Sequence, residues 1–335
     1  MKSKAEAMEA MKDLDSAIHR TRRFVSIFSA ILAIALILFS INMKPAMASE
    51  GGWSSYTPGT YGDFSMNYAA PGLYFRENVV YFKGKLDDMP VMPGINANLK
   101  QTTWFNLLGI TYVAPQKILG ANYFITTNIP YGFSAKLEAN VPAFGLTLSE
   151  SVSGFGELGV GDVWIAPIGL MWNIGSFHIT LTENIVLPTG KYDPDNLINM
   201  GRNYTSYDTD IGFTWLDEKN GHEVSLIAGY LINSTNHKTD YKTGNEFHVD
   251  FALNQFFSER FAVGITGYYY QQVTDDSGSG VVASDGYKSS SAGVGPAVFV
   301  GLTKDIQIMG KWIWEYHAKN RFKGNWATVS LVVKF

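Results

Sequence analysis

The chain has 335 residues and a formal net charge of −4, is 46% hydrophobic and 14% aromatic, and contains no cysteine. The lack of cysteine excludes thiol catalysis, iron–sulfur clusters and cysteine-ligated zinc, and the acidic balance argues against a nucleic-acid partner. With 18 Tyr and 8 Trp, the aromatic content exceeds what a soluble core needs and favours a protein with aromatic belts at membrane interfaces.

Residues 1–48 are predicted to be a cleaved signal peptide. Arg20, Arg22 and Arg23 precede an apolar stretch over 24–43, and the following Ala46-Met47-Ala48 is the small-x-small pattern that signal peptidase cuts. Cleavage removes seven basic and four acidic residues of the 26 and 30 in the chain, which leaves a formal charge of −7. A membrane anchor is the alternative, because the stretch is close to the roughly 20 residues that span a bilayer.

Residues 49–69 are rich in Gly, Ser and Tyr and precede the first predicted strand. From residue 70 onward the chain divides into segments rich in Val, Ile, Tyr, Phe and Thr, which are predicted to be strands. Short turns alternate with longer polar connections. The turns are expected at 114–117, 173–176, 217–221, 257–259 and 303–305, and the longer connections at 83–99, 149–160, 189–206, 234–244, 274–290 and 318–323.

This alternation of short and long connections predicts an all-β fold, a transmembrane antiparallel β-barrel over residues 70–335, with short periplasmic turns and longer extracellular loops. The segments number twelve. The segment 118–147 is far longer than one crossing requires, and a break at Pro130-Tyr131-Gly132 or at Pro142 would raise the number to fourteen. A soluble β-sandwich is disfavoured because it does not explain the apolar face formed by Phe247, Val249, Phe251 and Leu253.

The chain ends on an aromatic residue, Phe335, at the close of an alternating strand. Together with the signal peptide, this ending is typical of barrels of the bacterial outer membrane. We therefore expect the protein to lie in the lipid bilayer of the outer membrane and to be recognised by the barrel-assembly machinery through Phe335.

Strand alternation assigns polar side chains to the lumen. The functional interpretation is a polar conduit whose charges shape selectivity, and the alternative is that these groups pair with one another and fill the barrel. A twelve-stranded barrel nevertheless has more interior than its own side chains fill. Glu183 breaks the pattern, since it shares parity with Leu181 on the lipid side, and it requires a bulge or a position near the rim. The predicted lumen-lining residues are Arg76, Asp208, Asp210, His248, Asp250, Asn254, Lys311 and Glu315.

Enzymatic function is not expected. The sequence contains no G-x-S-x-G, no H-E-x-x-H and no P-loop motif. We therefore assign no catalytic residue, no cofactor and no metal ligand.

An ordered series of motifs spans nearly the whole of 49–335. The motifs include Gly120-Ala121-Asn122-Tyr123, Leu187-Pro188-Thr189-Gly190, Asn199-Met200-Gly201-Arg202-Asn203-Tyr204 and the run over 267–280 that contains Gly267-Tyr268-Tyr269-Tyr270. With these motifs, the chain resembles the outer-membrane transporter family named for the meta-pathway of phenol degradation. The family is loosely related to the long-chain fatty-acid outer-membrane channels. The resemblance implies passive uptake of small hydrophobic or aromatic compounds.

The same resemblance suggests that residues 49–69 fold back as a lumenal plug, with a periplasmic tail as the alternative. Tyr204, Tyr268 and Tyr270 are expected near the extracellular mouth, where they would collect apolar solutes. Two other functions stay open from the sequence: a nonspecific diffusion porin, and a structural or adhesive surface barrel that conducts nothing.

Overall fold

The computed structural model describes residues 48–92, 95–153, 159–196, 198–281 and 287–335. The predicted signal peptide therefore lies outside the described residues, except for its last residue. No helix in the described part of the chain is long and apolar enough to cross a bilayer. Two short 3-10 helices, η1 (Glu50–Gly52) and η2 (Pro142–Phe144), accompany strands β1 (Gly72–Met92), β2 (Ile95–Ile118), β3 (Ala121–Val141), β4 (Leu146–Ser153), β5 (Val163–Ile174), β6 (Phe177–Leu187), β7 (Ser206–Asp217), β8 (His222–Asn233), β9 (Glu246–Ser258), β10 (Phe261–Gln272), β11 (Ser290–Gly301), β12 (Ile306–Lys319) and β13 (Lys323–Lys334).

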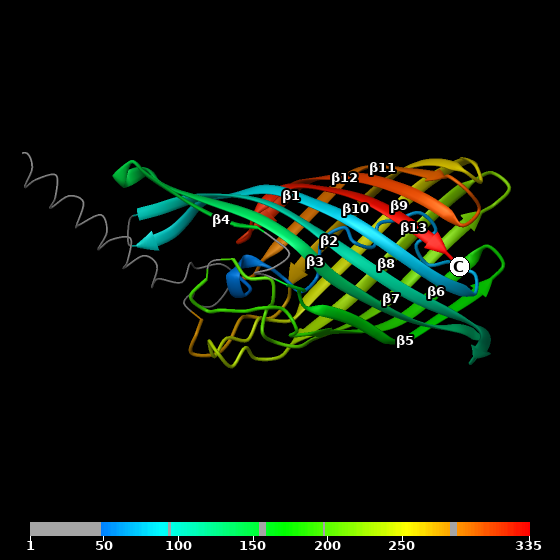
Figure 1. Ribbon diagram of the computed structural model, residues 1–335, viewed down its shortest axis with the longest axis horizontal. Helices are drawn as coiled ribbons and strands as arrows, with labels where there is room; N and C mark the ends of the chain where they lie inside the picture. The colour runs from blue at the N-terminus through cyan, green and yellow to red at the C-terminus, as the bar shows by residue number, and fades with distance from the viewer. Residues whose placement is uncertain (1–47, 93–94, 154–158, 197, 282–286) are drawn as a thin grey trace, which may run out of the picture. The chain divides into compact units, whose positions relative to one another are not determined.

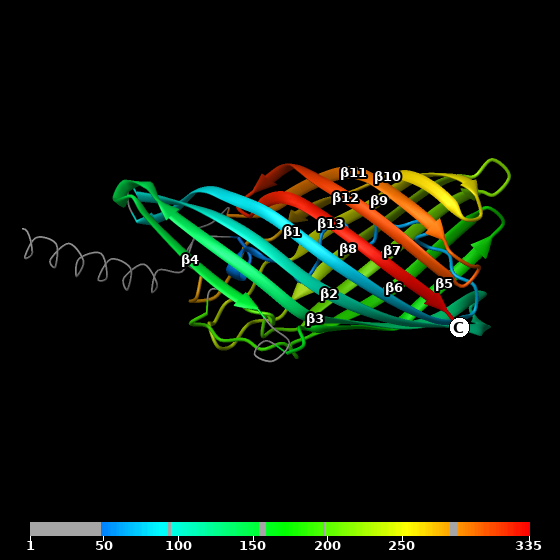
Figure 2. The ribbon, with the colours of Figure 1, turned by 45° about the horizontal axis from the view of Figure 1, so that its top comes forward.

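The strands close into an antiparallel barrel. From β5 to β13, each strand pairs with the next strand in sequence. β13 then pairs with β1, β1 with β2, β2 with β3, and β3 with β5, which closes the ring. Closure pairs the twelve strands of the wall all the way round, which a sheet in lipid requires because no water is available to bond free N–H and C=O groups. The strands wrap obliquely around the barrel, as both ribbon views show (Figures 1 and 2).

The barrel wall contains twelve strands, as the sequence predicts, with one additional strand. The chain turns at η2, where Gly145 adopts a left-handed conformation, and β4 then pairs with residues 134–141 of β3. Residues 122–128 of β3 pair with β5 instead. The predicted break at Pro142 is therefore present, but the resulting strand adds no crossing, and the alternative of fourteen is wrong.

Two predicted connections are strands, and so are the first residues, 149–153, of the connection expected over 149–160. The expected loop over 83–99 is the paired continuation of β1 and β2, in which Met89 and Leu99 are buried while Lys85 and Asp87 are exposed and form an ion pair. Because the outward residues of this hairpin are charged, its composition suggests a loop, although its inner face keeps the apolar alternation.

The expected turn at 114–117 is a bulge in β2, a place where a strand tolerates proline.

The chain instead reverses at Leu119-Gly120, where both residues have positive φ, as a two-residue hairpin turn of type I′ requires.

The outer face of the barrel is apolar and the inner face is largely polar. In β7, Ile211 and Phe213 are exposed while Asp208, Asp210 and Thr214 are buried. Glu183 lies on the outer face, where it accepts a hydrogen bond of 2.6 Å from the Thr209 hydroxyl. The neighbouring β5 has a bulge between Ile165 and Ile168, opposite this position.

The C-terminus lies at the edge of the barrel that carries the short turns (Figure 1). The backbone of Phe335 exchanges hydrogen bonds with Leu73, and its ring packs edge-on against Phe75 with centroids 5.3 Å apart. The ring is 72% exposed, so it contributes little to the packing of the barrel itself. An exposed terminal aromatic is available for recognition during assembly.

Replacing Phe335 with serine should lower the amount of folded protein in the outer membrane severalfold, because the last strand loses its terminal aromatic while the barrel loses little packing. The measurement is the heat-modifiable band in outer-membrane fractions. Phe257→Ser is the matched control, since Phe257 is 66% exposed near the end of β9 at the same edge. Equal amounts of folded wild-type and F335S protein would contradict the prediction.

Candidate functional site

Residues 49–69 lie inside the barrel and run from the loop end to the turn end (blue in Figure 1). At the loop end, the backbone N–H of Ser49 donates to Asp276 Oδ2 at 3.1 Å. At the other end, the Tyr74 hydroxyl donates to the carbonyl oxygen of Ala70 at 2.6 Å, at the start of β1. Between these ends the segment bonds to side chains of β1, β7, β8, β9 and β12.

At the loop end, the carboxylate of Glu50 is held by two loops of the barrel. It accepts hydrogen bonds from the hydroxyl of Thr239 at 2.6 Å, the amide of Asn236 at 2.8 Å and the hydroxyl of Tyr192 at 3.0 Å. Burial and the Glu50 carboxylate raise the pKa of Tyr192 to about 12. Tyr192 is therefore a neutral donor across the physiological range.

In the middle of the segment, Tyr56 lies flat against His248 of β9. Their rings are stacked at 4.1 Å, and the Tyr56 hydroxyl donates to Asp250 Oδ2 at 2.6 Å. Tyr61 is also stacked with the imidazole, with centroids 6.1 Å apart. Two tyrosines of one segment thus fix the position of a single histidine on the wall.

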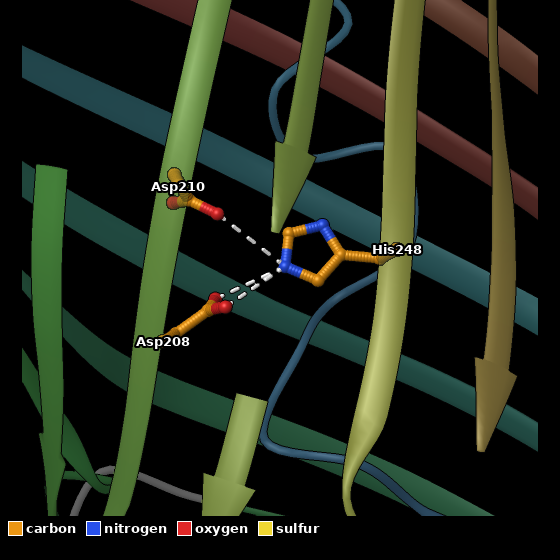
Figure 3. A group of neighbouring side chains, drawn as sticks. All are labelled: Asp208, Asp210 and His248. Carbon is orange, nitrogen blue, oxygen red and sulfur yellow. Dashed lines mark hydrogen bonds and ion pairs between the residues drawn. The ribbon is translucent and has the colours of Figure 1, made fainter. Parts of the chain in front are cut away.

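His248 also contacts two carboxylates of β7 (Figure 3). Its Nε2 lies 3.1 Å from both carboxylate oxygens of Asp208 and 3.5 Å from Asp210 Oδ1. All three side chains are almost completely buried. The strand register explains the meeting, because Asp210 pairs with Gly229 of β8 and Gly229 pairs with His248.

Towards the turn end, the segment is anchored by charges. The carboxylate of Asp63 forms ion pairs with Arg76 of β1 and with Lys311 of β12, the latter at 2.9 Å. The backbone N–H of Ser65 donates to Glu223 at 2.9 Å. Because Asp63 and Lys311 are each more than nine-tenths buried, the pair is shielded from solvent screening.

On the side of residues 49–69 that faces away from His248 and its carboxylates, Trp53 contacts an aromatic wall inside the barrel. Trp53 packs against Phe82 of β1, Trp326 of β13 and Phe322, with ring centroids 5.2 to 6.0 Å apart. The wall continues through Val80, Ala97, Leu99 and Ile313, all buried in the same cluster. The interior therefore has a polar wall formed mainly by β7, β8 and β9 and an apolar wall formed mainly by β12, β13, β1 and β2.

The structure buries six of the eight residues assigned to the lumen: Asp208, Asp210, His248, Asp250, Asn254 and Glu315. The Lys311 side chain is also buried, and that of Arg76 is half-buried.

The three tyrosines assigned to the mouth are each at most 2% exposed. Tyr268 donates a hydrogen bond to Glu315, and the guanidinium of Arg321 lies 4.6 Å from the ring centre of Tyr270.

Sequence reasoning missed several residues that the segment contacts. Glu223 and Glu246 are fully buried on the inner face. Alternation could have found both, since Glu223 precedes the outward Val224 and Glu246 shares parity with His248. Glu50 and Asp63 could not have been found this way, because residues 49–69 have no strand periodicity.

Two solved structures are similar to this chain. The solved structure of the COG4313 outer membrane channel from Pseudomonas putida F1 has a TM-score of 0.64 and 15% sequence identity, covering 84% of this chain and 100% of that one. The transport unit of the autotransporter AIDA-I from Escherichia coli has a TM-score of 0.46 and 13% identity, covering 83% of this chain and 94% of that one. No curated protein matches the chain.

The first of these likenesses supports the fold, a barrel of the bacterial outer membrane. The model of the family described as "Putative MetA-pathway of phenol degradation" matches residues 88–331, so the chain belongs to this family.

Proposed function

We propose that the barrel admits small hydrophobic compounds, aromatic ones among them, passively across the outer membrane, and that residues 49–69 form a plug that shifts to let them pass. The observation that carries this proposal is the aromatic and aliphatic wall inside the barrel, against which Trp53 packs. The membership in a family described by phenol degradation supports the same substrate class. The proposal assigns passage and no catalytic step.

The apolar wall suits such solutes energetically. Burying apolar surface is worth roughly 25 cal/mol per Å², and aromatic pairs add about 0.5–1.5 kcal/mol beyond that. A solute that takes the place of Trp53 beside Phe82 and Trp326 would recover contacts of the same kind that the plug gives up. A hydrophilic solute would recover none of them.

The plug argues against a wide diffusion pore. It contacts the polar wall through Ser55, Tyr56 and Ser65 and the apolar wall through Trp53. With the segment in this position, we expect only a small conductance.

Fixing the plug to the wall should abolish uptake. The hydroxyl oxygens of Ser55 and Ser206 lie 2.8 Å apart, so S55C and S206C place two thiols where a disulfide can form, and the chain has no other cysteine to interfere. Cells carrying the oxidised double variant should take up radiolabelled toluene no faster than cells lacking the protein. The S55C single variant, and the double variant after reduction, should behave like wild type.

Uptake by the oxidised variant at the wild-type rate would contradict a moving plug. A large, ohmic and unselective current through the wild-type protein in planar bilayers would instead indicate a porin. If cells with and without the wild-type protein take up toluene equally, the transport proposal fails and a structural barrel is favoured.

Asp63→Asn should loosen the plug, because it leaves Lys311 buried without its carboxylate. Breaking a buried ion pair from one side costs about 3–5 kcal/mol, so amide hydrogen exchange over residues 49–69 should accelerate by about a hundredfold or more. The measurement is exchange followed by mass spectrometry in detergent micelles. Asp305→Asn is the control, since its ion pair with Lys304 is exposed and is worth at most about 1 kcal/mol. Unchanged exchange in D63N would show that this pair does not anchor the segment.

A further inference from the structure

We propose that Asp208, Asp210 and His248 bind one divalent transition-metal ion, with zinc as the best match, inside the barrel. Each residue offers one ligand atom, and these atoms all lie within 4.8 Å of one another. The side chains converge from two strands, β7 and β9, with the His248 Nε2 directed between the two carboxylates (Figure 3).

The separations between the ligand atoms fit a shared ion. Zinc binds imidazole nitrogen and carboxylate oxygen at about 2.0–2.2 Å, so two ligands at tetrahedral or right angles lie about 3.0–3.5 Å apart. The observed separations from His248 Nε2 are 3.1 Å to both oxygens of Asp208 and 3.5 Å to Asp210 Oδ1. No large movement of the wall is needed to accept an ion.

The strand between them leaves the necessary space. Gly229 of β8 lies opposite Asp210 on one side and His248 on the other. A Cβ atom at this position would overlap both Asp210 Oδ1 and His248 Nε2. Glycine is therefore required here for the carboxylate and the imidazole to approach each other.

The second observation is a buried carboxylate oxygen without a hydrogen-bond partner. Among the described residues, Asp210 Oδ1 makes no hydrogen bond, and the Asp210 side chain is only 5% exposed. Buried polar atoms are normally paired, and leaving one unpaired is costly. Asp210 Oδ1 points at the imidazole nitrogen, where an ion would satisfy it.

The charges also favour a cation. Asp208, Asp210 and Asp250 surround one imidazole, and in the described structure their ion pairs are to His248 alone, with no lysine or arginine. Even a protonated imidazole leaves two negative charges uncompensated, and buried carboxylates without a counter-ion are strongly unfavourable. A divalent ion bound to the neutral imidazole reduces this excess to one negative charge.

The surrounding groups resemble the outer shell of a metal site. Metal-bound histidines usually donate their second ring N–H to a carboxylate, and Asp250 Oδ2 lies 3.8 Å from His248 Nδ1. Asp210 Oδ2 accepts from the amide of Asn184 at 2.7 Å, and Asp250 is oriented by the hydroxyl of Tyr56. One imidazole with two carboxylates suits zinc better than calcium, which takes six to eight oxygen ligands.

Binding of an ion would couple the wall to the plug. Tyr56 and Tyr61 both stack with the imidazole, so an ion that fixes the ring also fixes the surface on which the plug rests. Three protein ligands leave a coordination position for water. The ion would enter while residues 49–69 are displaced, since the seated segment covers His248.

The test is metal binding by the whole folded protein in detergent micelles after treatment with a chelator. The metal-free wild type should bind Co²⁺ at one ion per chain, with visible absorption that equimolar Zn²⁺ removes, and Zn²⁺ should raise the midpoint of thermal unfolding. Asp210→Asn and His248→Gln should lose this binding. Glu223→Gln is the matched control, because Glu223 is equally buried and contacts the plug at Ser65 but lies outside the cluster.

Absence of one-to-one Co²⁺ and Zn²⁺ binding by the wild type overturns the proposal and indicates a cluster held by direct His–Asp contacts. Undiminished binding in folded D210N and H248Q, verified by heat-modifiable mobility, also overturns it, as does loss of binding in E223Q. If D210N and H248Q fail to fold, the stoichiometry of the wild type and its Co²⁺ absorption decide alone.

Discussion

Closure of the barrel is the constraint on which the rest of the structure depends. In lipid, the strands must pair all the way round, and twelve strands enclose more space than their own inward side chains fill. Residues 49–69 occupy that space. Their side chains are accordingly matched to two different walls, with Tyr56 and Asp63 bonded to polar groups and Trp53 packed on aromatic rings.

The sequence was sufficient for the architecture because lipid and lumen impose a period of two along each strand. That period correctly separated Ile211 from Asp210 and Val249 from His248, and the turn spacing gave the twelve strands of the wall. The prediction of strands failed in the hairpin of β1 and β2 over 83–99, where charged residues such as Lys85 and Asp87 lie on the outer face. There only the inner face keeps the apolar alternation, and the composition suggests a loop.

The site could not be derived in the same way, because it depends on register between strands and on a segment without periodicity. Alternation places Asp210 and His248 on the inner face, but only the pairing of both with Gly229 brings them together. Register is set by turns and bulges across the whole wall. The sequence also does not predict which partner each inward charge has, since Asp63 bonds to Lys311, which lies 248 positions away in sequence.

If residues 49–69 move as proposed, the distribution of contacts along this segment determines which part of it can leave its position. Glu50 and Asp63 are anchors on either side of Trp53 and Tyr56, and both make several polar bonds. An apolar solute can replace the contacts of Trp53 but offers nothing to the partners of Glu50 or Asp63, so it can compete only for the part of the segment between these two residues. Displacement of that part would expose the apolar wall while Glu50 and Asp63 keep their polar bonds. These two anchors would then return the segment to its position once the solute has passed.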